Sequence, residues 1–96
     1  MADLNEAPWI DANVEVVKNY LKKEFENFSL SHRADKSLKH TFTVHDGKKL
    51  FTLFIGWPIL ADRSFTQARI DRLLKEHVAE EMRLHGGDGY HWTPSN

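Results

Sequence analysis

The chain contains no cysteine, and this absence removes several kinds of chemistry at once. Without cysteine there is no disulfide, no thiol nucleophile and no zinc site with thiolate ligands. A chain without disulfides fits a reducing compartment, so we expect a cytoplasmic protein. We also expect no bound cofactor, because the sequence has neither a phosphate-cradling glycine loop nor a dinucleotide-binding fingerprint.

An excess of one charge and a long hydrophobic run are also lacking. The 13 basic and 14 acidic residues give a formal net charge of −1, so no overall field draws the chain toward nucleic acid or anionic lipid. The longest apolar run, residues 53–61, contains Gly56 and Pro58 and is too short to cross a bilayer. The first six residues are polar and acidic, unlike a secretory signal. We therefore expect no membrane partner.

The length suits one domain, and we expect a single domain over residues 1–96. Residues 1–8 are expected to form a loose N-terminus. Residues 86–96 are first glycine-rich and then aromatic. Because disordered segments are poor in aromatic residues, we expect Tyr90 and Trp92 to dock on the domain. The alternative is that they form a short recognition peptide.

Two stretches have the hydrophobic period of an amphipathic helix. They predict one helix at about residues 9–26 and another at about residues 65–85. Ser64 and Gln67 form a capping-box pattern before the second helix, and Gly86 and Gly87 follow it as C-cap glycines. The apolar stripes are Ile10, Val14, Val17, Leu21 and Phe25 in the first helix, and Ile70, Leu73, Leu74, Val78 and Met82 in the second.

Between these helices, residues 38–56 indicate a β-hairpin. Asp46-Gly47 lies between alternating apolar residues, which is a strong signal for a two-residue turn. This turn places His45 opposite Lys48. The resulting register turns one mostly apolar face inward and leaves mainly Thr, Lys and His outside. The other expected pairs are Phe42 with Phe51, His40 with Leu53, Leu38 with Ile55, Thr41 with Thr52, Thr43 with Leu50, and Lys39 with Phe54.

A further strand is predicted before the hairpin, because apolar and polar residues alternate from Phe28 to Ala34. A three-residue connection at residues 35–37 would set His32 opposite His40. We interpret these histidines as partly buried, hydrogen-bonded groups, and a pH-sensitive pair is the alternative. The other expected pairs are Ala34 with Leu38, Leu30 with Phe42, and Phe28 with Val44.

The predicted fold class is α+β, with the element order α-β-β-β-α. We expect a three-stranded antiparallel meander with two helices packed on one face, because this arrangement buries every apolar side at once. The sequence has no nucleophile elbow and no other catalytic constellation. We therefore expect a protein that is not an enzyme.

The outer face of this sheet is the predicted site of protein interaction. Leu50 and Phe54 point to it among threonines, as in a contact platform. Scattered apolar residues are also common on ordinary surfaces, which is the alternative. The expected partner is another protein or a second copy of this chain. The predicted contact residues are Thr41, Thr43, Leu50, Thr52 and Phe54.

Nucleic-acid binding is an alternative function, because basic residues gather at the start of the second helix. Such a cluster would contact phosphates without reading a base sequence. The order α-β-β-β-α is similar to that of double-stranded-RNA-binding domains, but the lysine-rich helix start of those domains is absent here. A solvated face of mixed charge accounts for the same pattern. The basic residues are Arg63, Arg69, Arg72 and Lys75.

Metal binding is a second alternative. His77, Glu81 and His85 are spaced by four and so share one edge of the predicted helix. Imidazole and carboxylate groups suit zinc, although the spacing is not that of the His-Glu-x-x-His motif. Such residues also collect at the edge of an ordinary amphipathic helix.

Overall fold

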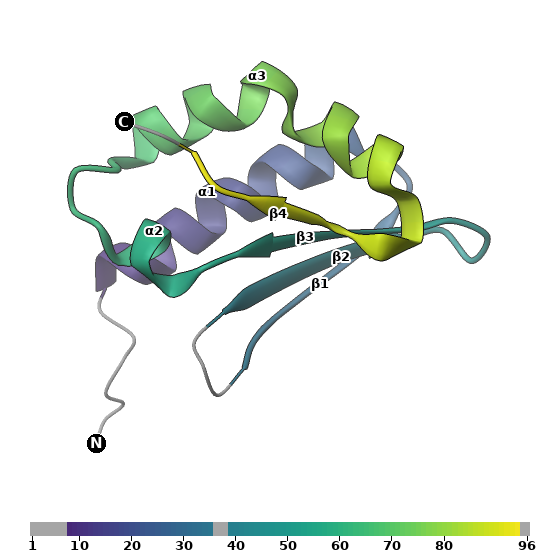
Figure 1. Cartoon of the computed structure of the whole chain (residues 1–96), viewed down its shortest axis with the longest axis horizontal. Helices are drawn as coiled ribbons and strands as arrows, with labels where there is room; N and C mark the ends of the chain where they lie inside the picture. Colours follow the sequence, from purple (N-terminus) through teal and green to yellow (C-terminus); the bar gives the residue numbers. More distant parts are fainter. Residues whose placement is uncertain (1–7, 36–38, 95–96) are drawn as a thin grey trace.

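The computed structural model describes residues 8–35 and 39–94 of the chain. A four-stranded sheet with the strand order β1-β2-β3-β4 is covered on one side by helices (Figure 1). This mixture of elements confirms the predicted α+β class. The elements are α1 (Pro8–Glu24), β1 (Ser29–Ala34), β2 (His40–His45), β3 (Leu50–Ile55), α2 (Trp57–Ala61), α3 (Gln67–His85), a 3₁₀ helix η1 (Gly86–Asp88) and β4 (Tyr90–Trp92).

The core lies between the two long helices and the inner face of the sheet. Tyr20 of α1 is buried there, and its hydroxyl accepts a hydrogen bond of 2.9 Å from the backbone N–H of Ala79 in α3. Burial of apolar surface at about 25 cal/mol per Å² is the main force that holds these layers together. The largest fully buried apolar side chains are Phe42, Ile10, Leu21, Leu53, Ile55, Leu60, Ile70, Leu74, Met82, Val17 and Val44.

The connection between β2 and β3 is longer than predicted. His45 lies opposite Leu50, not Lys48, so the turn has four residues and the expected register is wrong by two positions. The reason is the Asp46 side chain, whose Oδ1 accepts hydrogen bonds from the backbone N–H groups of Lys48 (2.9 Å) and Lys49 (2.7 Å). Because side chains alternate along a strand, a shift of two leaves every residue on its predicted face. The observed pairs are His40 with Ile55, Thr41 with Phe54, Phe42 with Leu53, Thr43 with Thr52, and Val44 with Phe51.

The register between β1 and β2 is also shifted by two positions. Ala34 lies opposite His40, because Asp35 and Lys39 close the turn: the Asp35 N–H donates to the Lys39 carbonyl at 3.0 Å. The prediction for Leu38 and the loose N-terminus over residues 1–7 lie outside the described residues. Pro8, also expected to be loose, begins α1. The other observed pairs are Ser29 with His45, Leu30 with Val44, Ser31 with Thr43, His32 with Phe42, and Arg33 with Thr41.

A fourth strand corrects the prediction of a purely antiparallel three-stranded meander. The C-terminal segment docks on the domain, as expected, by pairing as β4 with β3 in parallel. A parallel pair needs a crossover connection, which α2 and α3 provide. The short helix α2 was not predicted, although Pro58 suits a first helical turn. Tyr90 lies opposite Leu53, and Trp92 lies buried opposite Ile55.

Helix α3 begins two residues later than expected, and its cap is Thr66 in place of Ser64. The Thr66 hydroxyl accepts a hydrogen bond from the N–H of Arg69 at 3.2 Å. The Ser64 hydroxyl instead donates to Asp62 Oδ1 at 2.7 Å. Gly86, with φ of 58°, ends the helix as predicted. Within the described part of the chain, no helix is both long enough and apolar enough to cross a membrane.

Candidate interaction surface

The side of the sheet that faces away from α1 and α3 is here called the outer face (Figure 1). Strand alternation assigns each residue of the sheet to one face, and the inner positions are those buried in the core. All five predicted contact residues lie on the outer face. Its strand positions are Ser29, Ser31 and Arg33 in β1, Thr41, Thr43 and His45 in β2, Leu50, Thr52 and Phe54 in β3, and His91 in β4.

The predicted contact residues differ in how much of them a partner could reach. Leu50 is 47% exposed, and Thr41, Thr43 and Phe54 are half-buried. Thr52 is only 8% exposed, so its side chain offers little contact area. Thr52 lies in the middle of β3, where it pairs with Thr43 of β2, while β4 pairs with residues 53–55 on the other side of the strand.

Phe54 is held in place by its neighbours on the outer face. Its ring stacks on that of His91, with centroids 4.4 Å apart, and the Lys39 ammonium lies 5.1 Å from the ring centroid. The ring also lies so close to Gly89 that a Cβ added there would be 2.5 Å from Phe54 Cε2. The aromatic surface of Phe54 is therefore used within the chain.

The outer face carries little charge, and Asp35, just after β1, lies beside Lys39 and accepts a hydrogen bond of 2.9 Å from the Lys39 backbone N–H. Arg33 occupies a strand position on this face, and Lys39 reaches it over Phe54. No strand position of the outer face carries a carboxylate in the described residues. Asp46 lies beyond the end of β2, in the turn, where hydrogen bonds from the backbone of Lys49 and then of Lys48 lower the pKa of its carboxyl.

Two hollows open along this surface. One, of about 210 Å³, lies at β1 and β2 and is lined by Ser31, His32, Arg33, Thr41 and Thr43. The other, of about 330 Å³, lies beside Phe54 and His91 and extends to α2. Its remaining lining residues are Lys39, Gly56, Pro58, Ile59, Trp92 and Thr93.

The basic residues at the start of α3 are mostly engaged within the chain. The Arg63 guanidinium lies 4.1 Å from the centroid of the Trp9 ring, and that of Arg69 lies 4.9 Å from the centroid of Phe65. Lys75 pairs with Asp71 at 2.9 Å, as the solvated-face alternative implies. Arg69 also donates to the Ser64 carbonyl at 3.3 Å, which leaves the N–H groups of Arg63 and Arg72 available, and two arginines are a weak basis for nucleic-acid binding.

The histidines of α3 do not gather into a metal site. His85 Nε2 lies 3.5 Å from Glu81 Oε1. The described residues contain no group of three histidine or carboxylate side chains that could hold a metal ion, so His77 does not complete a set with this pair. The His85 ring instead lies 5.4 Å from that of Tyr90, near the start of β4.

The predicted closeness of His32 and His40 is present, although the two residues are diagonal neighbours. His32 Nε2 lies 2.8 Å from His40 Nδ1, and the ring planes are within 5° of each other. Burial, and then the charge of His40, lower the pKa of His32 to about 4. Burial also lowers the pKa of His40, which is 1% exposed. His40 Nε2 has no hydrogen-bond partner among the described residues.

Sequence reasoning missed three residues that shape the surfaces of this molecule. They are His91, which stacks on Phe54, Trp9, which lies under Arg63 at the start of α1, and Lys39, which was expected beside Phe54 but was not named as a contact residue. The alternation in Tyr90-His91-Trp92 is the signal that could have indicated a strand and placed His91 beside Phe54. No family model, curated protein or solved structure matches this chain.

Proposed function

We propose that this chain is a non-enzymatic, cytoplasmic interaction domain whose outer face docks an acidic surface of another protein. The proposal is carried by one observation: at the strand positions of the face that the helices leave uncovered, the described residues include Arg33 and no carboxylate, and Lys39 reaches this face over Phe54. Opposite charge on a partner raises the association rate and excludes partners of the same charge. The formal net charge of −1 means that this positive surface is local.

A second copy of the chain is a poor match for this face. In a face-to-face dimer, Arg33 and Lys39 of each copy would meet side chains of the same charge. Contacts between like charges raise the free energy of a complex, so they disfavour this dimer. The charge pattern therefore favours a partner of different composition.

Single-stranded nucleic acid is also a poor match. Proteins that bind it without sequence preference stack bases on free aromatic faces. Here the Phe54 ring already stacks on His91 and lies under the Lys39 ammonium. A protein partner needs no such stacking, because Leu50 and the threonines can contact side chains directly.

Each group on the outer face has a distinct proposed role. Leu50 supplies an exposed apolar contact, and the hollow beside Phe54 has room for an apolar side chain of the partner. Thr41 and Thr43 offer hydroxyl groups that donate and accept hydrogen bonds. Arg33 can form a bidentate pair with a carboxylate, which would orient the partner.

The test uses two synthetic peptides and the isotope-labelled full chain. A short peptide of alternating Glu and Leu should shift the backbone amide NMR signals of Thr41, Thr43 and Leu50. A peptide of alternating Lys and Leu with the same length should leave them in place. The acidic peptide should bind more weakly in higher salt, because exposed charges are screened within about 8 Å at physiological ionic strength.

Three outcomes would overturn the proposal. One is equal binding of the two peptides. Another is shifts confined to β1 amides, which would mean that the peptide adds to the open sheet edge. The third is tight binding of an oligothymidine with no response to the acidic peptide, which would favour nucleic acid. Self-association through this face would be indicated if the molecular mass in solution doubled as the protein concentration rose and the Leu50→Glu variant had a lower mass at the same concentration.

A further inference from the structure

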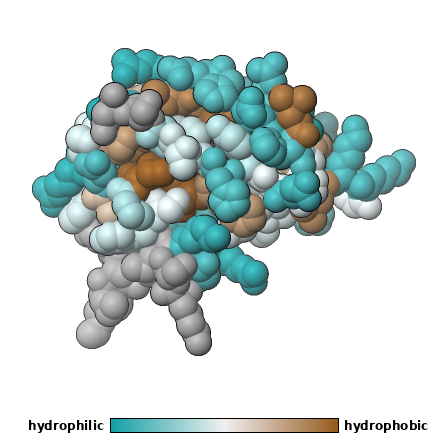
Figure 2. All heavy atoms as spheres, viewed as in Figure 1, coloured by the Kyte–Doolittle hydropathy of each residue, from teal (hydrophilic) through white to brown (hydrophobic). Residues whose placement is uncertain are grey.

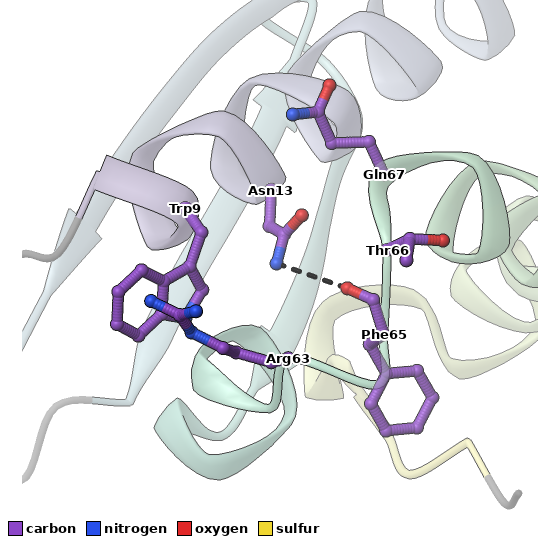
Figure 3. Close-up of a pocket in the computed structure, with 6 residues that line it drawn as sticks. All are labelled: Trp9, Asn13, Arg63, Phe65, Thr66 and Gln67. Carbon is purple, nitrogen blue, oxygen red and sulfur yellow. Dashed lines mark hydrogen bonds between the residues drawn. The ribbon is translucent and has the colours of Figure 1, made fainter.

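A second surface feature lies on the helical side of the molecule, away from the outer face. It is an open pocket of about 690 Å³ where the start of α1 meets the segment between α2 and α3 (Figure 3). A pocket of this volume is in the range that holds small molecules. Its lining residues are Trp9, Asn13, Arg63, Phe65, Thr66 and Gln67.

Asn13 provides a buried polar group at this pocket. The residue is 3% exposed, and its Nδ2 donates to the carbonyl oxygens of Leu60 (2.9 Å) and Phe65 (3.4 Å). These two bonds use both amide protons. The carbonyl oxygen Oδ1 points away from Phe65, toward the side where Gln67 lies (Figure 3), and no donor to it is found in the described residues. Because Asn13 lines the pocket, this oxygen can accept a hydrogen bond from a ligand group that carries a proton.

Among the described residues that line the pocket, Arg63 is the charged one. Its guanidinium lies over the Trp9 ring, with Cζ 4.1 Å from the ring centroid, and the Trp9 indole N–H donates a bond of 2.9 Å to the Ala61 carbonyl. A guanidinium stacked in this way keeps its N–H edges free to pair with a carboxylate. The neighbouring Asp62 forms no ion pair with Arg63 among the described residues, and its Oδ1 accepts from the backbone N–H and the hydroxyl of Ser64.

The start of α3 adds two further donors. The Thr66 hydroxyl accepts a hydrogen bond from the Arg69 N–H, and the Thr66 carbonyl accepts one from the Ile70 N–H. The N–H groups of Gln67 and Ala68 have no acceptor within the helix. They favour a negative group near the mouth of the pocket.

We propose that this pocket binds a small aromatic carboxylate that also carries a hydroxyl group. The carboxylate pairs with Arg63 and the N–H groups at the start of α3. The hydroxyl donates to Asn13 Oδ1, and the aromatic body packs beside Trp9. The site is independent of the proposed outer-face function, because none of its residues lies on the sheet.

Three related probes separate these contacts. Mandelate carries the ring, the carboxylate and the hydroxyl; phenylacetate lacks the hydroxyl, and mandelamide lacks the charge. For a probe of this size we expect a mandelate Kd of about 1–10 mM. Mandelate should shift the NMR signals of the Gln67 and Ala68 amides and of the Trp9 indole N–H. Phenylacetate should bind several-fold more weakly, and mandelamide should leave these signals unchanged.

A pair of arginine variants supplies the control. Arg63→Gln should weaken mandelate binding at least about tenfold, since it removes the only charged partner. Arg72→Gln, at an exposed position of α3, should bind mandelate as the parent chain does. The proposal is overturned if mandelamide or inorganic phosphate shifts the same signals as strongly as mandelate. It is also overturned if mandelate causes no shift, or if both variants bind it equally.

Discussion

His32 Nε2 and His40 Nδ1 lie 2.8 Å apart on the inner face of the sheet, close enough for only one proton between them. The pair lies between α1 and the sheet, where Glu15, Lys18 and Asp11 of α1 and Asp35 after β1 contribute charge. His40 is buried, so a charge on it would have little access to water. The neutral pair is therefore the form that the fold favours.

Protonation of this pair should make stability depend on pH. The pKa of His32 falls from 6.5 in the unfolded chain to about 4 in the folded chain, so the unfolded state binds the proton first as the pH is lowered. The free energy of unfolding should therefore fall between pH 6.5 and pH 4. After allowance for the partial exposure of His32, we expect a loss of roughly 1 kcal/mol by pH 5. Urea unfolding at several pH values measures this loss.

A pair of histidine variants tests whether His32 causes the effect. His32→Asn should weaken the dependence of stability on pH between pH 6.5 and pH 5, and the part due to buried His40 should remain. His45→Asn, at the exposed end of β2, should leave it as in the parent chain. If the free energy of unfolding depended on pH equally in both variants, a group other than His32 would be responsible for the pH dependence.

Asn13 should stabilise the fold more than its size suggests, because it links α1 to two backbone carbonyls beyond β3. Asn13→Ala should lower the free energy of unfolding by about 2 kcal/mol, since it leaves buried carbonyl groups without donors. Asn19→Ala, at an exposed position of the same helix, is the matched control and should cost less than about 0.5 kcal/mol. Denaturant titration would contradict this role if the two losses were equal.

The bond from the Ala79 N–H to the Tyr20 hydroxyl should couple the two long helices. Tyr20→Phe keeps the ring and removes only the acceptor, so we expect a loss of about 1 kcal/mol. Hydrogen exchange of the Ala79 amide should also become faster. An unchanged exchange rate in the variant would indicate that this bond contributes nothing to the local stability of α3.

Gly89 should be required for the position of β4. Its φ is 84°, and the Phe54 ring occupies the space where a side chain would begin. Gly89→Ala should therefore cost about 1–3 kcal/mol and displace the Phe54 ring. Gly87→Ala is the control, because nothing lies within 4 Å of its added Cβ. Similar stability of the two variants, with unchanged Phe54 ring signals, would contradict the close packing.

The sequence predicted which face of each strand is buried but not which residues lie opposite one another. The alternation of apolar and polar residues predicts the buried face of a strand, and a register shift of two positions does not change that face. Which residues lie opposite one another depends on turn geometry. The expected two-residue turn is longer because Asp46 Oδ1 accepts hydrogen bonds from the backbone N–H groups of Lys48 and Lys49. β4 was missed because three residues are too few for a periodic signal, and its pairing with β3 depends on a tertiary crossover.

The pocket was less predictable than the outer face. Trp9, Asn13 and Arg63 come from segments about fifty residues apart, and local pattern does not reveal such a meeting. The outer face follows directly from alternation within neighbouring strands, so the five predicted residues were brought together as expected. Alternation also placed Lys39 on that face beside Phe54, but none of Arg33, Lys39 and His91 was predicted as a contact residue.

The most direct measurement of the central claim compares two charge reversals at exposed arginines. Arg33→Glu places a carboxylate on the outer face, and Arg72→Glu places one on α3. The affinity of each variant for the peptide of alternating Glu and Leu is measured by calorimetry, with circular dichroism as a check on folding. We predict at least about a tenfold loss for Arg33→Glu and no more than about a twofold change for Arg72→Glu. Equal affinities of the two folded variants would contradict the assignment of the outer face as the docking surface.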